Sequence, residues 1–238
     1  MRPVYPFIFL LSTLFTSFTF AHNIWVEAPT HLIQGTPTPV TAYFAHPDQA
    51  LGDRDQTSLS LNVITPLGQH TVLALTEHAT YYTAILAPQT PGLYQLLLSR
   101  EPYRYRLSEI RDFGKTWLGN ESLPEASVPP AGLALEIHPT DIQWHKNGHS
   151  TWRLQALHQG QPVPDIEISV YQSEDESELR LPAETLNTDN QGEALISLAP
   201  AKAHLFTWEY RVPARVVENT GWGVREVRYR TTLFVQLP

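Results

Sequence analysis

Imidazole is the side chain that dominates the metal chemistry open to this sequence. The 238 residues contain ten His, no Cys and one Met, and that Met is the initiator Met1. Thiolate metal sites, cysteine nucleophiles and disulfides are therefore excluded, and so is Met-rich Cu(I) binding. Any transition metal must be held by nitrogen or oxygen ligands.

An apolar leader places one of these histidines at a special position. Residues 1–21 carry Arg2 and then an uncharged run rich in Phe and Leu that ends in Thr19-Phe20-Ala21. The pattern is typical of a signal peptide and predicts export to the periplasm. An uncleaved membrane anchor is the alternative, because the run is nearly long enough to span a bilayer. Cleavage after Ala21 makes His22 the first residue of the mature chain.

An N-terminal His offers two nitrogen ligands, its α-amine and its Nδ1 atom, which close a chelate ring on one metal ion. The amine titrates near neutrality, so its deprotonation costs little. A second imidazole would complete a T-shaped site of three nitrogens, the histidine brace, which suits Cu(II) or Ni(II). The alternative is that signal cleavage merely happens to leave a His at position 22.

Alternation with a period of two selects His46 as the second imidazole. His22 shares one face with Ile24 in a strand predicted over 23–27, and His46 shares one face with Phe44 at the end of a strand predicted over 39–46. If the two strands are neighbours, the imidazoles meet at one edge of a sheet. We therefore predict that His22 and His46 are metal ligands. The alternative for His46 is a rim histidine bonded to a loop carbonyl.

The other histidines are weaker candidates. His145 and His149 flank an Asn-Gly pair that predicts a two-residue hairpin, in which His145 pairs with Ser150 and the two imidazoles point to opposite faces. His204 opens a predicted strand and would approach the site only if the two halves of the chain packed face to face. The remaining histidines have no partner at ligand spacing and are predicted to lie at the surface or to cap elements: His31, His70, His78, His138 and His158.

The elements that must position these residues are almost all strands. Alternating or β-branched runs broken by Pro, Gly and Asn recur along the chain, and amphipathic helices are scarce. Their spacing predicts an all-β fold of two tandem Ig-like β-sandwiches. The predicted strands cover 23–27, 39–46, 58–64, 70–75, 81–86 and 93–99 in the first half, and 133–138, 151–157, 166–171, 193–198, 204–212 and 227–237 in the second.

The predicted domain division depends on one irregular segment. Residues 109–131 contain two Gly and three Pro without a sustained period, which indicates a linker. The predicted organisation is a signal peptide over 1–21, an N-terminal sandwich over 22–108, this linker, and a C-terminal Ig-like sandwich over 132–238. The last strand alternates cleanly between apolar and polar residues, which predicts one buried face.

Charge and missing motifs narrow the classes of function. Asp and Glu outnumber Lys and Arg by 24 to 16, for a net charge of -8, which argues against nucleic acid as a partner. No G-x-S-x-G elbow, phosphate-binding loop or HExxH motif occurs, so the sequence shows no hydrolase. No segment after the leader is apolar enough to span a bilayer, which predicts a protein that is peripheral to the membrane at most.

Six motifs, taken in order along nearly the whole mature chain, resemble those of one family. They are Ala21-His22-Asn23-Ile24-Trp25-Val26-Glu27, Tyr43-Phe44-Ala45-His46, Gly114-Lys115-Thr116, residues 132–139, residues 160–168 and Asn187-Thr188-Asp189-Asn190-Gln191-Gly192. The family consists of uncharacterised periplasmic domains associated with the periplasmic component of cobalt and nickel transport systems. Two positions depart from its pattern: Ala45 stands where the family usually has Gly, and His138 where it often has Val.

The resemblance implies a two-domain protein of the Gram-negative periplasm that handles a divalent transition metal, and it carries over His22 and His46 as ligands. We therefore predict a binding protein for Ni, Co or Cu that serves membrane metal transporter components and catalyses no reaction. Two alternatives stay open. One is an oxidative copper enzyme that uses the histidine brace, and the other is a carbohydrate-binding or adhesion module in which the sandwich is only a scaffold.

Overall fold

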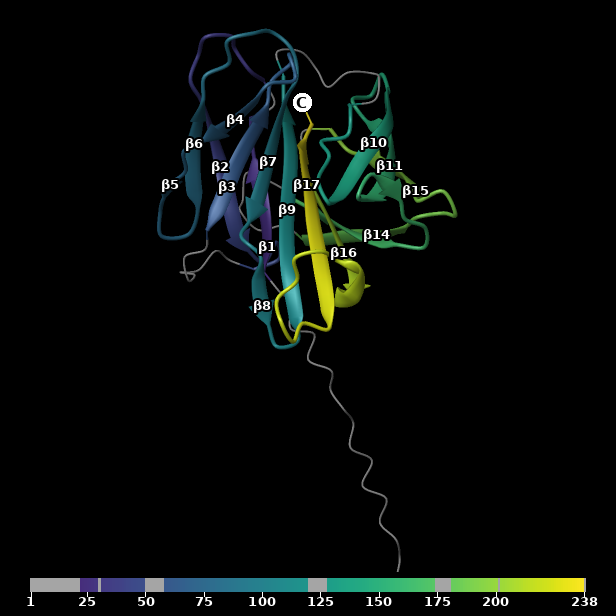
Figure 1. The fold of residues 1–238 in the computed structure, drawn as a ribbon. Coiled ribbons are helices and arrows are strands. Elements are labelled where there is room, and N and C mark those ends of the chain that lie inside the picture. Colours follow the sequence, from purple (N-terminus) through teal and green to yellow (C-terminus); the bar gives the residue numbers. More distant parts are fainter. Residues whose placement is uncertain are drawn as a thin grey trace, which may run out of the picture.

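A computed structural model describes residues 22–29, 31–49, 58–119, 128–173, 181–200 and 202–237, which form strands connected by turns (Figure 1). Within these ranges the only helical element is a short 3-10 helix, η1 (Ala214–Val216). The prediction of an all-β sandwich fold is therefore confirmed. No helix in the described ranges is both long and apolar enough to cross a membrane. The predicted signal peptide, residues 1–21, lies outside the described residues.

The strands form three sheets. The first contains, in spatial order, β1 (Asn23–Glu27), β2 (Thr38–Ala45), β6 (Tyr82–Leu86) and β5 (Thr76–Glu77). The second contains β10 (Leu135–Trp144), β11 (Ser150–His158) and β12 (Gln161–Pro162), with β15 (Glu193–Leu198) beside β11. The third contains β14 (Leu181–Asn187), β13 (Glu167–Gln172), β16 (Ala203–Pro213), β17 (Glu226–Gln236), β9 (Ser108–Leu118), β7 (Tyr94–Arg100), β3 (Leu59–Ile64) and β4 (His70–Leu73), with β8 (Tyr103–Tyr105) beside β9.

The third sheet runs through both halves of the chain, because β9 pairs in parallel with β17 from Ser108 opposite Glu226 to Lys115 opposite Leu233. The first and second sheets cover opposite faces of it. Leu118 of β9 belongs to the core under the first sheet, whereas its neighbour Trp117 belongs to the core under the second. Successive residues of a strand point to opposite faces. The two sandwiches thus share one sheet, and the division into two domains stays a prediction.

The predicted linker is wrong for residues 109–118, which form most of β9. The strand escaped the sequence analysis because its buried positions are polar as well as apolar. Lys115 is 1% exposed, and its Nζ atom lies 2.5 Å from Oε1 of Glu136 in β10. Glu136 also accepts hydrogen bonds from the backbone N–H groups of Ala131 and Gly132. This buried pair fixes the start of the second sandwich to β9.

All twelve predicted strands are present, and β10 continues to Trp144, past its predicted end at His138. The single buried face predicted for the last strand is wrong, because β17 is buried on both faces from Arg230 to Val235. The added cover is β1, which lies across β17 and β9. The Thr232 hydroxyl donates a 2.7 Å hydrogen bond to the backbone oxygen of Ile24.

Gly114 in β9 permits this close approach of β1. A Cβ atom at Gly114 would lie 3.1 Å from Oγ1 of Thr232, 3.2 Å from the backbone oxygen of Ile24 and 3.3 Å from Cα of Trp25. Two of these neighbours are backbone atoms, which cannot rotate away. Glycine at this position therefore sets the distance between the first sheet and the shared sheet.

We expect Gly114→Ala to lower the free energy of unfolding by about 1–3 kcal/mol, the usual cost of overpacking, because β1 must move outward. Gly221→Ala is the matched control, since its nearest neighbour would be Cγ2 of Val224 at 3.6 Å, an ordinary contact. Urea unfolding followed by tryptophan fluorescence measures both changes. Equal stability of the two variants would contradict the close packing of β1 on β9.

Candidate metal centre

The two predicted ligands lie beside each other at the start of β1 and the end of β2. These strands pair antiparallel, with Asn23 opposite Ala45 and Ile24 opposite Phe44. The ring centroids of His22 and His46 are 4.4 Å apart, and the ring planes are inclined at 52°. The prediction that neighbouring strands bring the two imidazoles together is confirmed. Their role as metal ligands stays a prediction.

Phe44 and Arg100 pack behind the imidazole pair. The ring of Phe44 meets the ring of His22 edge to face at 4.9 Å between centroids. The guanidinium carbon of Arg100 lies 4.3 Å from the centroid of Phe44 and 3.8 Å from that of Tyr103. Such cation-π contacts hold the aromatic ring in place. The imidazoles therefore rest on a packed support.

A buried ion pair lies behind this support. Arg230 donates to both carboxylate oxygens of Asp112, from Nε at 2.6 Å and from Nη2 at 2.7 Å, and the two residues are 5% and 2% exposed. Burial alone would lower the pKa of the Arg230 guanidinium, but the charge and hydrogen bonds of Asp112 raise it above its ordinary value. Nη1 of Arg100 lies 3.6 Å from the same carboxylate. Asp112 thus holds two permanent cations in place.

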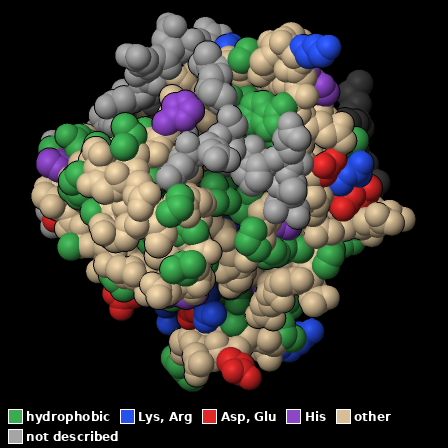
Figure 2. Space-filling model, turned by 90° about the horizontal axis from the view of Figure 1, so that it is seen from above, with side chains coloured by type: hydrophobic (Ala, Val, Ile, Leu, Met, Phe, Trp, Pro, Cys, Tyr) green, Lys and Arg blue, Asp and Glu red, His purple; other side chains and the backbone are tan. Residues whose placement is uncertain are grey.

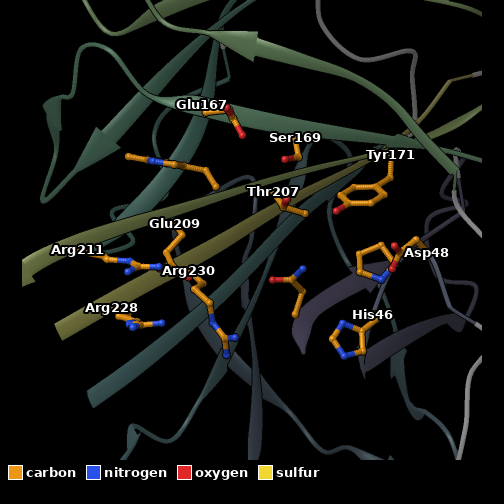
Figure 3. Close-up of a pocket in the computed structure, with 13 residues that line it drawn as sticks. His46, Asp48, Glu167, Ser169, Tyr171, Thr207, Glu209, Arg211, Arg228 and Arg230 are labelled. Carbon is orange, nitrogen blue, oxygen red and sulfur yellow. The ribbon is translucent and has the colours of Figure 1, made fainter. Parts of the chain in front are cut away.

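His46 also lines a groove of about 430 Å³ beside the first sheet, on the uncovered face of β13, β16 and β17 (Figure 3). Figure 3 shows His46 and Asp48 near Tyr171, with Arg211 and Arg228 at the far end. One wall comes from residues Asn23, His46, Pro47 and Asp48, and the floor comes from β13, β16 and β17 through Glu167, Ser169, Tyr171, Thr207, Trp208, Glu209, Arg211, Arg228 and Arg230. The groove therefore combines residues that are far apart in sequence.

The groove is polar and carries charges of both signs. Arg211 pairs with Glu209 at 2.5 Å, and Arg228 pairs with Glu226 at 2.7 Å. Both pairs are partly exposed, so each adds little to stability. Burial, together with the nearby negative charge of Asp48, raises the pKa of the Tyr171 hydroxyl. Tyr171 therefore stays neutral and offers a hydrogen-bonding hydroxyl near the imidazole pair.

A metal ion at His22 and His46 would need a further ligand. In the parts of the chain that the structure describes, no three His, Asp or Glu side chains converge on one point. The α-amine of His22 would supply the third nitrogen in a chain cleaved after Ala21. Two imidazoles and this amine fit Ni(II) or Cu(II), which accept nitrogen ligands in tetragonal geometry.

The predicted hairpin at Asn147-Gly148 has a different register. The backbone N–H of His145 donates to the oxygen of His149 at 2.8 Å, and Trp144 pairs with Ser150. Three residues therefore form the turn, and Gly148 adopts the left-handed φ of 81° that such a turn requires. His145 thus lies opposite His149 rather than opposite Ser150, and its Nε2 atom is 2.8 Å from Oγ1 of Thr151.

Two histidines are buried on the far side of the shared sheet. His204 alternates with Leu205, which belongs to the same core cluster as Trp25 of β1, so His204 points toward the second sheet and away from His46. His138 is 6% exposed, so the prediction that it lies at the surface is wrong. Burial lowers the pKa of both imidazoles to about 4, and the nearby charges of Lys115 and Lys202 act in the same direction on His138 and His204 respectively.

The sequence did not predict the groove floor. Its polar residues alternate along three strands, as in Glu167, Ser169 and Tyr171 of β13. This alternation was visible in the sequence, but it is equally typical of any solvated sheet face. Only the pairing of β13, β16 and β17, and the position of His46 at their edge, show that these side chains share one groove.

We expect the free energy of unfolding to fall as the pH drops from 6.5 toward 4. In this window the unfolded chain protonates His204 and the folded chain does not, because the folded pKa of about 4 lies below the ordinary value of 6.5. Urea unfolding of His204→Gln at several pH values should show a smaller fall, by up to about 3 kcal/mol. The control is His78→Gln at an exposed site, which should follow the native protein. An unchanged pH dependence in His204→Gln would contradict the buried neutral imidazole.

Three solved structures are distantly similar to this chain. Trypsin-activated alpha-2-macroglobulin from Escherichia coli is 11% identical, with a TM-score of 0.28 over 92% of this chain and 16% of its own. A DUF4785 family protein from Legionella pneumophila is 13% identical, with a TM-score of 0.31 over 89% of this chain and 56% of its own. The D0-D1 domain of Intimin is 16% identical, with a TM-score of 0.26 over 90% and 97%. This chain thus spans only part of the first two proteins.

No curated protein sequence matches the chain. The family model that does match covers residues 19–212, which include the imidazole pair, the shared strand β9 and most of the groove floor. The chain belongs to the family described as a domain of unknown function, DUF4198.

Proposed function

We propose that the chain is a periplasmic binding protein for a divalent transition metal, Ni(II), Co(II) or Cu(II), that serves a membrane metal-uptake system. The observation that carries this proposal is the 4.4 Å separation of the His22 and His46 rings at the edge of a groove. The resemblance of the sequence motifs to periplasmic domains of cobalt and nickel transport supports the proposed role in uptake.

The ring separation suits binding of one ion. Two imidazoles bound at right angles to one ion have centroids about 4.5 Å apart, because each metal–nitrogen bond is about 2 Å long. The observed 4.4 Å is close to this value. Such binding would need one nitrogen of each ring to point at the ion, on strands β1 and β2 that are already paired.

The proposal includes binding without catalysis. An oxidative enzyme that attacks polysaccharides needs a flat, open substrate face, whereas the groove floor consists mainly of hydroxyl groups and paired charges. Its Trp208 is 3% exposed and packs in the core, so its indole offers no platform for a sugar ring. A capture site for a small ion fits these surroundings better.

We expect protein purified after export to begin at His22 and to bind one ion. His46→Ala, and a form with one Ala inserted before His22, should each bind more than about 100-fold more weakly, since loss of even an outer-sphere partner costs up to that factor. Intact mass and calorimetric titration with Ni(II), Co(II) and Cu(II) measure these effects.

His78→Ala is the matched control for the titration, because His78 is exposed and contacts Thr83 of β6 and Tyr81 just before it. It should bind as the native protein does. Equal affinity in all four forms, or a leader that export leaves attached, would refute the site. Oxygen consumption by the copper-loaded protein with a reductant would replace the binding role with an oxidative one.

We also expect acid to release the metal. An imidazole must be neutral to bind an ion, and its ordinary pKa is about 6.5, so affinity should fall steeply as the pH drops from about 7 to about 5. Titrations at constant ionic strength across this range give the dependence. Affinity that does not change over the range would show that the ligands are not imidazoles.

A further inference from the structure

Two connections meet at the end of the molecule where β8 lies, at the bottom of Figure 1. One is residues 104–107, the end of β8 and its turn into β9, and the other is residues 214–225, between β16 and β17. We call these two segments together the basic tip. They contain four Arg and one Glu, although the whole chain has a net charge of -8. The tip therefore has a charge opposite to that of the protein.

Hydrogen bonds hold the two segments side by side. Arg104 donates from Nη1 to the backbone oxygen of Trp222 at 3.0 Å and from Nε to the oxygen of Arg106 at 2.9 Å. The backbone N–H of Arg225 donates to the oxygen of Leu107 at 2.8 Å. The tip is thus a defined surface rather than two independent loops.

The tip also exposes large apolar side chains. Trp222 is 96% exposed and Val216 65%, and Tyr105 and Leu107 are each 45% exposed. By contrast, Trp25 and the other tryptophans of the core are nearly inaccessible. An indole is a large apolar group with one polar N–H, and a fully exposed one next to other apolar side chains indicates a contact surface.

We propose that the basic tip binds the surface of a membrane that contains anionic phospholipids. Trp and Tyr favour the boundary between headgroups and acyl chains, because one part of each ring is apolar and the other polar. The planar guanidinium groups of Arg106, Arg215 and Arg225 match phosphate groups, and a negative surface attracts each of them, whereas Arg104 donates to backbone oxygens within the tip. Arg104 donates to the backbone oxygen of Trp222, which holds in place the backbone that carries the exposed indole.

The opposite end of the molecule has a different character. Figure 2 looks onto that end, where several of the visible Lys and Arg side chains lie beside Asp or Glu side chains. The imidazole pair lies nearer to the basic tip, because Arg100 contacts both Tyr103 of β8 and Phe44 beside His22. Membrane binding through the tip would therefore bring His22 toward the bilayer. Binding of the basic tip to a membrane does not require a metal ion at His22 and His46.

Co-sedimentation of the exported protein with lipid vesicles tests the proposal. We expect binding to phosphatidylcholine vesicles that contain about a third phosphatidylglycerol, and little binding to pure phosphatidylcholine. Trp222→Ala should weaken the partition coefficient about tenfold through lost apolar contact. Arg106→Gln and Arg215→Gln should each weaken it about fivefold at low salt.

Leu195→Ala is the matched control, because Leu195 is 57% exposed on β15, away from the tip. It should partition as the native protein does, and the unfolding midpoints of all forms show that they are folded. All forms carry the same N-terminus, checked by intact mass, so a retained leader cannot create the difference. Equal binding by Trp222→Ala, equal binding to neutral vesicles, or no binding of the native protein would overturn the proposal, and a dimer formed through the tip would replace it.

Discussion

The parallel pairing of β9 with β17 is the constraint on which the rest of the structure depends. It joins strands that are more than a hundred residues apart and turns two sandwiches into one body with a shared sheet. Arg230 and Asp112 are cross-strand partners within this pairing, and their buried ion pair would leave an uncompensated charge if the strands separated. Losing one partner of such a pair costs about 3–5 kcal/mol. The ion pair therefore fixes the register in which β9 and β17 pair.

The ion pair of Arg230 and Asp112 also connects the paired strands β9 and β17 to the candidate metal site. Asp112 holds Arg230 and lies beside Arg100, Arg100 stacks on Phe44, and Phe44 packs against His22. Gly114, two residues along β9, allows β1 to lie close enough for this chain of contacts to form. The position of the first residue of the predicted mature chain is thus set by residues near its middle and its end.

The sequence predicted the strands and the imidazole pair because both depend on local alternation. Ile24, Val26, Ala42 and Phe44 mark one face of β1 and β2, and His22 and His46 continue that pattern to the ends of the strands. The strand β9 was missed because Asp112, Lys115 and Thr116 look like loop residues until their buried partners are known. The groove was missed for a related reason: which face of β13, β16 and β17 stays uncovered depends on where another sheet ends. The local sequence pattern of a strand does not show which of its faces another sheet covers.

The shared sheet also decides how a bound ion could leave. Binding proteins built from two lobes around a hinge release their ligand when the lobes swing apart. Here the groove has one wall from the first half and a floor from the second, and eight ladder positions between β9 and β17 connect the two. Opening the groove by lobe movement would break that ladder. An ion bound at His22 and His46 would therefore be released through a chemical change at the ligands, such as protonation or exchange with a competing donor, while the scaffold stays still.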